Sequence, residues 1–105
     1  MLRIYTDIIA LVAELAQDVE RIEKRDADLA RQLRRAASSI ALNTMEGSGQ
    51  RAGNRRLRYE SALGSLREVT AVLDIAEALR MTTRREAVRA RIDGIGGTLF
   101  KLTRR

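Results

Sequence analysis

The sequence contains no cysteine, no proline and no histidine among its 105 residues. Without cysteine no disulfide can form, and thiol usage does not constrain the redox compartment. Histidine is the commonest metal ligand and the commonest general base near neutral pH, so the usual serine–histidine sites are excluded. Aromatic residues are scarce too, since the chain has only Tyr5, Tyr59 and Phe100. These absences make an enzyme the least favoured class.

Long uncharged runs are also missing. The first apolar run, residues 8–12, is closed by Glu14 and is too short for a secretory signal. No stretch approaches the roughly 18 apolar residues that a membrane-spanning helix needs. We therefore expect a cytoplasmic protein, and the length predicts one domain over residues 1–105.

Arginine is the residue in excess: 18 of the 20 basic residues are arginine, and the net charge is +6. Residues 1–28 carry a net charge of −3, residues 29–67 carry +6 and residues 68–105 carry +3. Arginine presents a planar fork that matches phosphate oxygens, so this distribution favours a polyanionic partner. A GC-rich genome, in which arginine codons are abundant, explains the excess equally well.

Apolar residues recur every three or four positions in four segments, which is the spacing of amphipathic helices. No segment shows the alternation typical of a strand. Short connections join only antiparallel neighbours, so the sequence predicts an all-α, up-and-down antiparallel four-helix bundle. The four stripes are Ile4, Ile8, Leu11, Val12, Leu15, Val19 and Ile22; Leu29, Leu33, Ala36, Ala37, Ile40 and Thr44; Tyr59, Ala62, Leu63, Leu66, Val69, Leu73 and Ala76; and Val88, Ile92, Ile95, Leu99 and Leu102.

Capping signals mark the ends of the second helix. Asp26 and Asp28 are both available as its N-cap. The segment "GSGQRAG", residues 47–53, offers glycines for a left-handed cap at its other end, with the third helix beginning near Asn54. A phosphate-binding glycine loop would follow a strand, whereas this segment follows a helix. We therefore predict that these glycines form a turn.

The fourth helix carries two signals. "TRRE" has the spacing of a capping box, with Thr83 and Glu86 satisfying the first-turn donors. Three glycines then interrupt the helix, at Gly94, Gly96 and Gly97, and each costs roughly 1 kcal/mol relative to alanine. They indicate a close approach of another backbone, a kink or fraying.

A second set of apolar and small residues on the middle two helices lies outside the core stripes. Large exposed apolar patches mark interaction sites, so we predict an oligomer interface there. The alternative is a broad core face in a crowded bundle. The predicted interface residues are Leu42, Met45, Leu57, Gly64, Val72, Ile75 and Leu79.

Polar residues on the inward or interfacial faces of the same helices need partners, because an unpaired buried charge is very costly. We predict a structural polar network of Arg35, Asn43, Glu46 and Glu68. A catalytic pair of Glu46 and Glu68 is a third and weaker interpretation. The usual di-metal bundle needs Glu-x-x-His motifs, so neither a metal nor another cofactor is expected.

Five arginines are predicted to bind nucleic acid: Arg34, Arg51, Arg55, Arg56 and Arg58. Four of them cluster at the turn between the second and third helices. Tyr59 and Phe100 are expected in the core, so base stacking is expected to contribute little. The contacts would then go to backbone phosphates.

The stretches "QLRRAASSIALNTMEGSGQR" and "ALGSLREV" resemble the signature of a bacterial four-helix-bundle family. That family includes the proteins encoded in intervening sequences of large-subunit ribosomal RNA genes and the accessory variability determinants of diversity-generating retroelements. A frequent proline is replaced here by Ala41, and the usual isoleucine–alanine before Glu46 is Thr44–Met45. The matching residues are Gln32, Leu33, Arg34, Arg35, Ala36, Ser39, Ile40, Asn43, Glu46, Gly47, Gly64, Ser65, Leu66 and Glu68.

The resemblance implies a homopentameric bundle with a basic surface that binds nucleic acid and with no enzymatic activity. It also implies a reverse transcriptase as a candidate partner. We therefore predict a non-enzymatic oligomeric protein that binds the RNA or DNA backbone through arginines. The alternative is a protein–protein scaffold with no nucleic-acid role.

Overall fold

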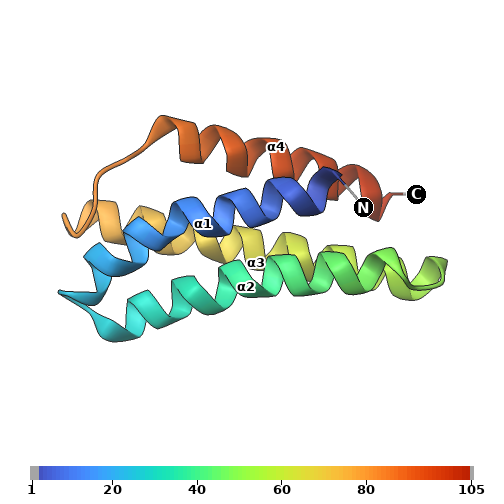
Figure 1. Ribbon diagram of the computed structural model, residues 1–105, viewed down its shortest axis with the longest axis horizontal. Helices are drawn as coiled ribbons and strands as arrows, with labels where there is room; N and C mark the ends of the chain where they lie inside the picture. The colour runs from blue at the N-terminus through green and yellow to red at the C-terminus, as the bar shows by residue number, and fades with distance from the viewer. Residues whose placement is uncertain (1–2, 105) are drawn as a thin grey trace.

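The computed structural model describes residues 3–104, apart from the side chain of Ala52. Four helices run alternately up and down, and no strand occurs in this described part of the chain (Figure 1). The predicted all-α antiparallel four-helix bundle is confirmed. The helices are α1 (Arg3–Glu23), α2 (Ala27–Ser48), α3 (Ala52–Ala78) and α4 (Glu86–Thr103).

Each helix turns its predicted apolar stripe toward one shared core. Most stripe residues are buried, and Val12, Leu63 and Leu102 are half-buried against them. The core positions with no exposed surface include Ile8, Leu11, Ile22, Leu33, Ile40, Ala62, Val69 and Leu99. Because the stripes recur at helical spacing, their burial follows directly from the sequence pattern.

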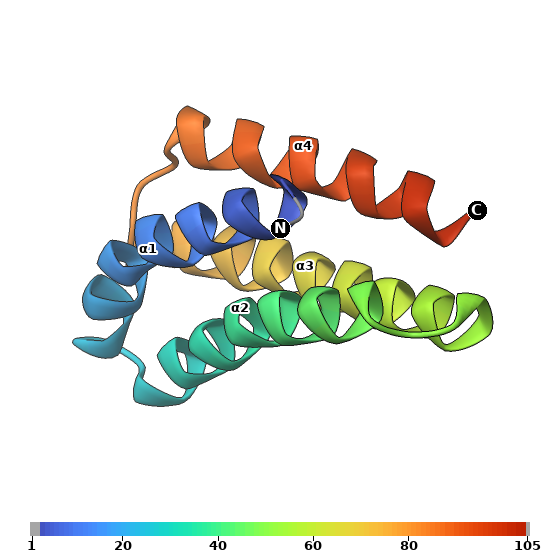
Figure 2. The same ribbon diagram turned by 45° about the vertical axis from the view of Figure 1, so that its right-hand side comes forward.

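The bundle has two different ends. One end carries the α2–α3 turn together with the start of α1 and the end of α4, and the α2–α3 hairpin projects beyond the start of α1 there (Figures 1 and 2). The opposite end carries the α1–α2 and α3–α4 turns. We call the first the basic end and the second the paired end, because their arginines differ as described below.

Gly47 sets the close packing of α2 on α3 near the basic end. A Cβ atom at Gly47 would lie 3.0 Å from Tyr59 Cε1 and 3.1 Å from Arg58 Cβ, tighter than ordinary contacts. The absence of a side chain at Gly47 therefore permits this close packing. A Gly96 Cβ would lie 3.4 Å from Leu66, whereas Gly94 and Gly97 have no neighbour within 4 Å of the Cβ position, and α4 runs unbroken through all three.

The caps of α2 follow the sequence at its start and depart from it at its end. Asp26 is the N-cap, since its side chain accepts a hydrogen bond of 2.9 Å from the Leu29 N–H. The predicted left-handed glycine cap is wrong, because Gly49 has φ −102°. The Gly49 and Gln50 N–H groups instead donate to carbonyls three residues back, which tightens the last turn and satisfies them.

Among residues 3–104, Arg80 is the one in the left-handed region, with φ 60°, just after α3. The Met81 N–H donates to the Ala76 carbonyl at 2.8 Å, and the Arg80 N–H donates to the Glu77 carbonyl at 3.1 Å. This is a Schellman motif, which usually places glycine where Arg80 stands. A side chain in this conformation costs about 1 kcal/mol or more.

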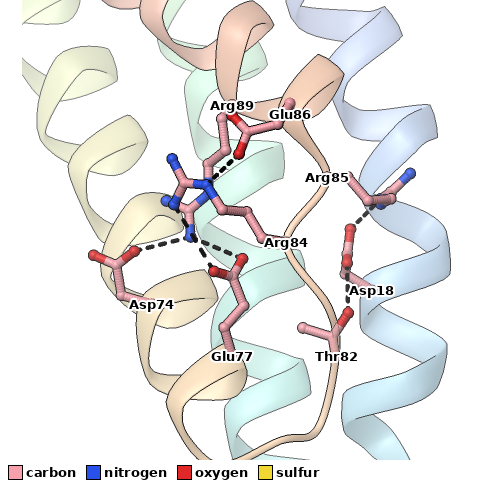
Figure 3. Close-up of polar contacts among 8 residues, drawn as sticks. All are labelled: Asp18, Asp74, Glu77, Thr82, Arg84, Arg85, Glu86 and Arg89. Carbon is pink, nitrogen blue, oxygen red and sulfur yellow. Dashed lines mark hydrogen bonds and ion pairs between the residues drawn. The ribbon is translucent and has the colours of Figure 1, made fainter.

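An ion pair between a buried carboxylate and a half-buried guanidinium anchors the α3–α4 turn to α1 (Figure 3). Asp18 is 2% exposed and pairs with the Arg85 guanidinium, while its other oxygen accepts a hydrogen bond of 3.0 Å from the Thr82 hydroxyl. Arg85 also donates to the Glu14 backbone carbonyl at 2.8 Å, and Arg91 pairs with the Glu14 carboxylate at 2.6 Å. These contacts hold the α3–α4 turn and the start of α4 against α1.

The same anchoring explains why the predicted capping box at Thr83 is wrong. Arg85 is the N-cap of α4, with extended backbone angles and no side-chain cap, and α4 begins only at Glu86. Because Thr82 and Arg85 are bound to Asp18, the chain stays extended past Thr83. Tertiary contacts thus override the local signal.

A second cluster joins α4 to α3 beside the first (Figure 3). Arg89 lies 2.8 Å from Glu77 and 2.9 Å from Asp74, and Arg84 lies 4.0 Å from Glu77. Burial alone would lower the pKa of the Arg89 guanidinium, but its hydrogen bonds to Glu77 and Asp74 outweigh burial and raise that pKa. Arg89 is therefore a permanent cation held between two acids.

Candidate nucleic-acid interface

The α2–α3 turn and the first turns of α3 present four arginines to solvent at the basic end. Arg51 is the N-cap residue of α3 with no side-chain cap bond, and Arg55, Arg56 and Arg58 follow on the first two turns. All four are exposed. The first-turn N–H groups of α3 lie at the same end of the bundle, so backbone donors and guanidinium groups are near one another there.

These arginines differ in how far the protein neutralises them. Arg58 lies 3.2 Å from Glu46, and Arg56 lies 3.9 Å from Glu60, both pairs being about half-exposed. Within residues 3–104, neither Arg51 nor Arg55 has an ion-pair partner. Placing arginine at a helix N-terminus opposes the helix dipole, so an external anion would stabilise this arrangement.

Arg34 lies apart from the other four. It sits on α2 about four turns, or roughly 21 Å, from the end of that helix, and its guanidinium is 4.0 Å from Glu23. The structure therefore brings together Arg51, Arg55, Arg56 and Arg58 but not Arg34.

The four residues of the predicted polar network share the outer seam between α2 and α3 without forming one connected network. The Asn43 amide donates to the Ser39 carbonyl and hydroxyl at 2.9 and 3.0 Å, and the Ser65 hydroxyl donates to Ser39 at 2.8 Å. Arg35 and Glu68 are exposed, and neither forms a side-chain hydrogen bond or ion pair with another described residue. The sequence motif contained the serines, but only the helix register shows that they meet.

Six of the seven predicted interface residues form what we call the outer face of the α2–α3 hairpin. The exception is Val72, which is 2% exposed and belongs to the core, because α3 packs against both α2 and α4 and so buries a wide arc. On α3 the exposed positions Leu57, Ser61, Gly64, Glu68, Ala71 and Ile75 recur at three or four residues. The outer face is made up of Leu42, Met45, Leu57, Gly64, Ile75 and Leu79, all exposed.

The expectation that both aromatics lie in the core is right for Tyr59 and wrong for Phe100. Tyr59 is 3% exposed and its ring packs against Gly47, whereas Phe100 is 47% exposed near the end of α4. The Arg104 guanidinium lies over the Phe100 ring, 5.1 Å from its centroid. Lys101 is exposed beside them. Phe100 falls one position after the core residue Leu99, so helical phase was the available signal.

Two other kinds of site find no support in the described part of the chain. No three acidic side chains there gather as a metal-binding group. None of its helices is long and apolar enough to cross a bilayer. The exposed arginine cluster and the outer face are therefore the features that distinguish this surface.

The fold and surface are those of an antiparallel four-helix bundle with a basic end and an apolar outer face. Residues 1–100 match the family model described as 23S rRNA-intervening sequence protein. The chain belongs to the 23S rRNA-intervening sequence protein family, as the sequence motifs indicated.

A solved structure shares this fold. It is the crystal structure of a protein with unknown function from the S23 ribosomal protein family, from Bacteroides thetaiotaomicron VPI-5482. The TM-score is 0.86 at 15% sequence identity, over 97% of this chain and 99% of that one. A comparison with curated proteins found no match. The family and the neighbour carry names that describe no catalytic activity.

Proposed function

We propose that this protein is a non-enzymatic, oligomeric bundle that binds the phosphate backbone of RNA or DNA through the basic end. The observation that carries the proposal is the pair Arg51 and Arg55, which are exposed and have no ion-pair partner in residues 3–104. Every other guanidinium at the helix start lies near a carboxylate. Charged groups left without an internal partner are available to an external anion. A cytoplasmic location suits such a ligand.

The ligand class follows from the chemistry of this end. Arginine binds phosphate oxygens with two parallel hydrogen bonds, and the uncapped N–H groups of α3 add further donors. Contacts of this kind position a nucleic acid without reading its sequence. The family's name refers to 23S rRNA, which is compatible with an RNA ligand.

Assembly would multiply these contacts. The outer face exposes Leu42, Leu57 and Leu79 at more than half of their surface, which favours burial against another copy of the chain. Arg35 and Glu68, of opposite charge, lie on the same hairpin without a partner within the described chain, so they are available to pair across a subunit boundary. We propose the homopentamer that the family resemblance implies, which would repeat the basic end five times and add avidity.

A second candidate is a protein–protein scaffold, and the outer face is the observation that favours it. In that case the apolar residues bind a different protein, and the arginines at the basic end are only a solvated surface. Nucleic-acid binding separates the two candidates, because the scaffold has no reason to bind phosphate.

Fluorescence anisotropy on labelled RNA and DNA oligonucleotides of mixed sequence, across a salt series, tests the proposed function. We expect binding with little sequence preference. Its log affinity should fall with log salt with a slope near −0.9 per phosphate neutralised on duplex DNA and about −0.7 on single strands. An absence of binding even at low salt would favour the scaffold.

Light scattering tests the assembly. The wild type should have about five times the chain mass of 11.8 kDa. Leu42→Glu should reduce the mass to that of smaller species with unchanged helix content, because a charge cannot be buried in an apolar interface without a partner. Ile9→Glu is the matched control, since Ile9 is an exposed apolar residue on α1, away from the outer face. A wild-type monomer with intact helices would contradict the assembly.

A further inference from the structure

Phe100 is the one aromatic side chain of the described residues that stands exposed, and it stands among cations. It is 47% exposed, with the Arg104 guanidinium 5.1 Å from its ring centroid and Lys101 next to it in sequence. An exposed aromatic ring costs hydrophobic free energy that a core position would recover. Aromatic rings flanked by arginine and lysine are the elements from which single-strand-binding surfaces are built.

The register of α4 on α3 places Phe100 toward the basic end. Arg89 contacts Asp74 and Glu77 of α3, and seven residues later Gly96 lies beside Leu66. Positions 89, 96 and 100 fall on one stripe of α4, because seven and four residues are close to whole helical turns. Phe100 therefore lies on the side of α4 that faces α3.

Continuing that antiparallel register puts Phe100 about level with Ala62 and Arg104 about level with Arg58. Arg56 lies on the same flank of α3, since it is 18 residues, about five turns, before Asp74, which contacts α4. Arg56 is then only about 9 Å further along the bundle axis than Phe100. The ring and the arginines of the basic end thus lie within reach of one short strand of nucleic acid.

We propose that Phe100 is a stacking platform for an unpaired base, and that the ligand of the basic end is therefore single-stranded nucleic acid. The proposal rests on the proposed phosphate-binding function and names its ligand more closely. A duplex keeps its bases stacked on one another, so it can use the arginines but not the ring. A single strand can use both, with its phosphates on Arg55 and Arg56 and one base on Phe100.

Arg104 is compatible with a base on either face of the Phe100 ring. Its guanidinium already covers one face of Phe100, which leaves its outward N–H groups free to contact a phosphate. A base can stack on the other face of the ring or replace the guanidinium. In both cases the cation lies next to the nucleotide whose base is bound.

The test measures anisotropy at low salt with a labelled single strand of about twelve nucleotides, within known site sizes, and with the duplex of the same sequence. Phe100→Ala and Phe100→Leu should each weaken single-strand binding about tenfold or more and leave duplex binding unchanged. Phe100→Trp should retain or strengthen it. Ile9→Ala, a truncation of an apolar residue of 43% exposure on α1, should leave both ligands unaffected.

A ligand-side control removes one base at a time. Single abasic sites along the strand should weaken wild-type binding most where the base stacks on Phe100. The same abasic site should have little further effect on Phe100→Ala, because the partner of that base is already gone. This non-additivity distinguishes stacking from a general loss of stability.

Three results would overturn the proposal. Equal binding of the single strand by wild type, Phe100→Ala and Phe100→Leu would exclude stacking while leaving the phosphate function standing. A fall in assembly mass for Phe100→Ala would make the ring a subunit contact instead. A wild type that binds neither ligand would overturn the proposed function as well, and it is recognised without any variant.

Discussion

At the paired end of the bundle, Arg85 and Arg89 lie against Asp18, Glu77 and Asp74, acids that the protein itself supplies. At the basic end, Arg51 and Arg55 are exposed and have no such partner within residues 3–104. The same residue type thus fastens helices at one end and stays available at the other. The comparison shows that the partner of an arginine, and not its abundance, indicates its task.

Of the substitutions that test this difference between the two ends, the removal of Asp18 should have the largest effect. Asp18→Ala should lower the free energy of unfolding by about 3 kcal/mol, because it leaves Arg85 and Thr82 without their buried partner. Urea denaturation measures this change. Glu60→Ala is the control, since its pair with Arg56 is 3.9 Å long and half-exposed and should be worth less than about 0.5 kcal/mol. Equal losses for the two variants would break the comparison.

Arginine removal at the basic end should affect binding and spare stability. Arg55→Ala with Arg56→Ala should weaken binding to oligonucleotides and reduce the salt slope by about 1.8 on duplex or about 1.4 on single strands, the amounts for two phosphates. Unfolding free energy should change by less than about 0.5 kcal/mol, because both side chains are exposed. Arg25→Ala with Arg31→Ala removes the same charge near the α1–α2 turn, where both side chains are exposed, and serves as the control. An unchanged slope would remove these arginines from the interface.

Arg80 should respond in the opposite direction from the other arginines of the paired end. Arg80→Gly should raise the free energy of unfolding by about 1 kcal/mol, because glycine adopts φ 60° without steric cost. Arg80→Ala removes the same charge but keeps a Cβ atom, so it should not stabilise the protein. Thermal melts of the two variants separate strain from charge. Equal melting temperatures would show that the left-handed residue is not strained.

The smallest effect is expected at Glu46, the acid that shields Arg58. Its side chain is about half-exposed, so Glu46→Gln should cost less than about 1 kcal/mol in a thermal melt. Freed from this partner, Arg58 should bind phosphate better, and anisotropy should show a modest gain in affinity. Glu20→Gln makes the same charge change on α1 and should not increase affinity. A large loss of stability would instead support the predicted structural role of Glu46.

The bundle and its core were predictable because they depend on a repeated pattern. Each stripe contributes several apolar residues at helical spacing, so an error at one position does not alter the face. The Asp26 cap was available for a similar reason, since its partner Leu29 is three residues away. Local spacing carries this information.

The polar contacts were not predictable because their partners are distant in sequence. Asp18 lies at a core position of α1, between Leu15 and Ile22, and an acid in an apolar stripe was the available signal for a buried partner. Nothing local identifies that partner as Arg85. The capping box at Thr83 failed through this same contact. Val72 and Phe100 were misplaced because one helical step of about 100° separates core from surface.

The Asp18–Arg85 pair also has a kinetic consequence. The helix pairs α1–α2, α2–α3 and α3–α4 are neighbours along the chain and can form quickly, whereas this pair closes a loop of 67 residues. We therefore expect the α1–α4 contact to form last, after the folding transition state. Loss of Asp18 should then speed unfolding and leave the folding rate nearly unchanged. The ion pair would therefore lengthen the lifetime of the native bundle without changing how fast it folds.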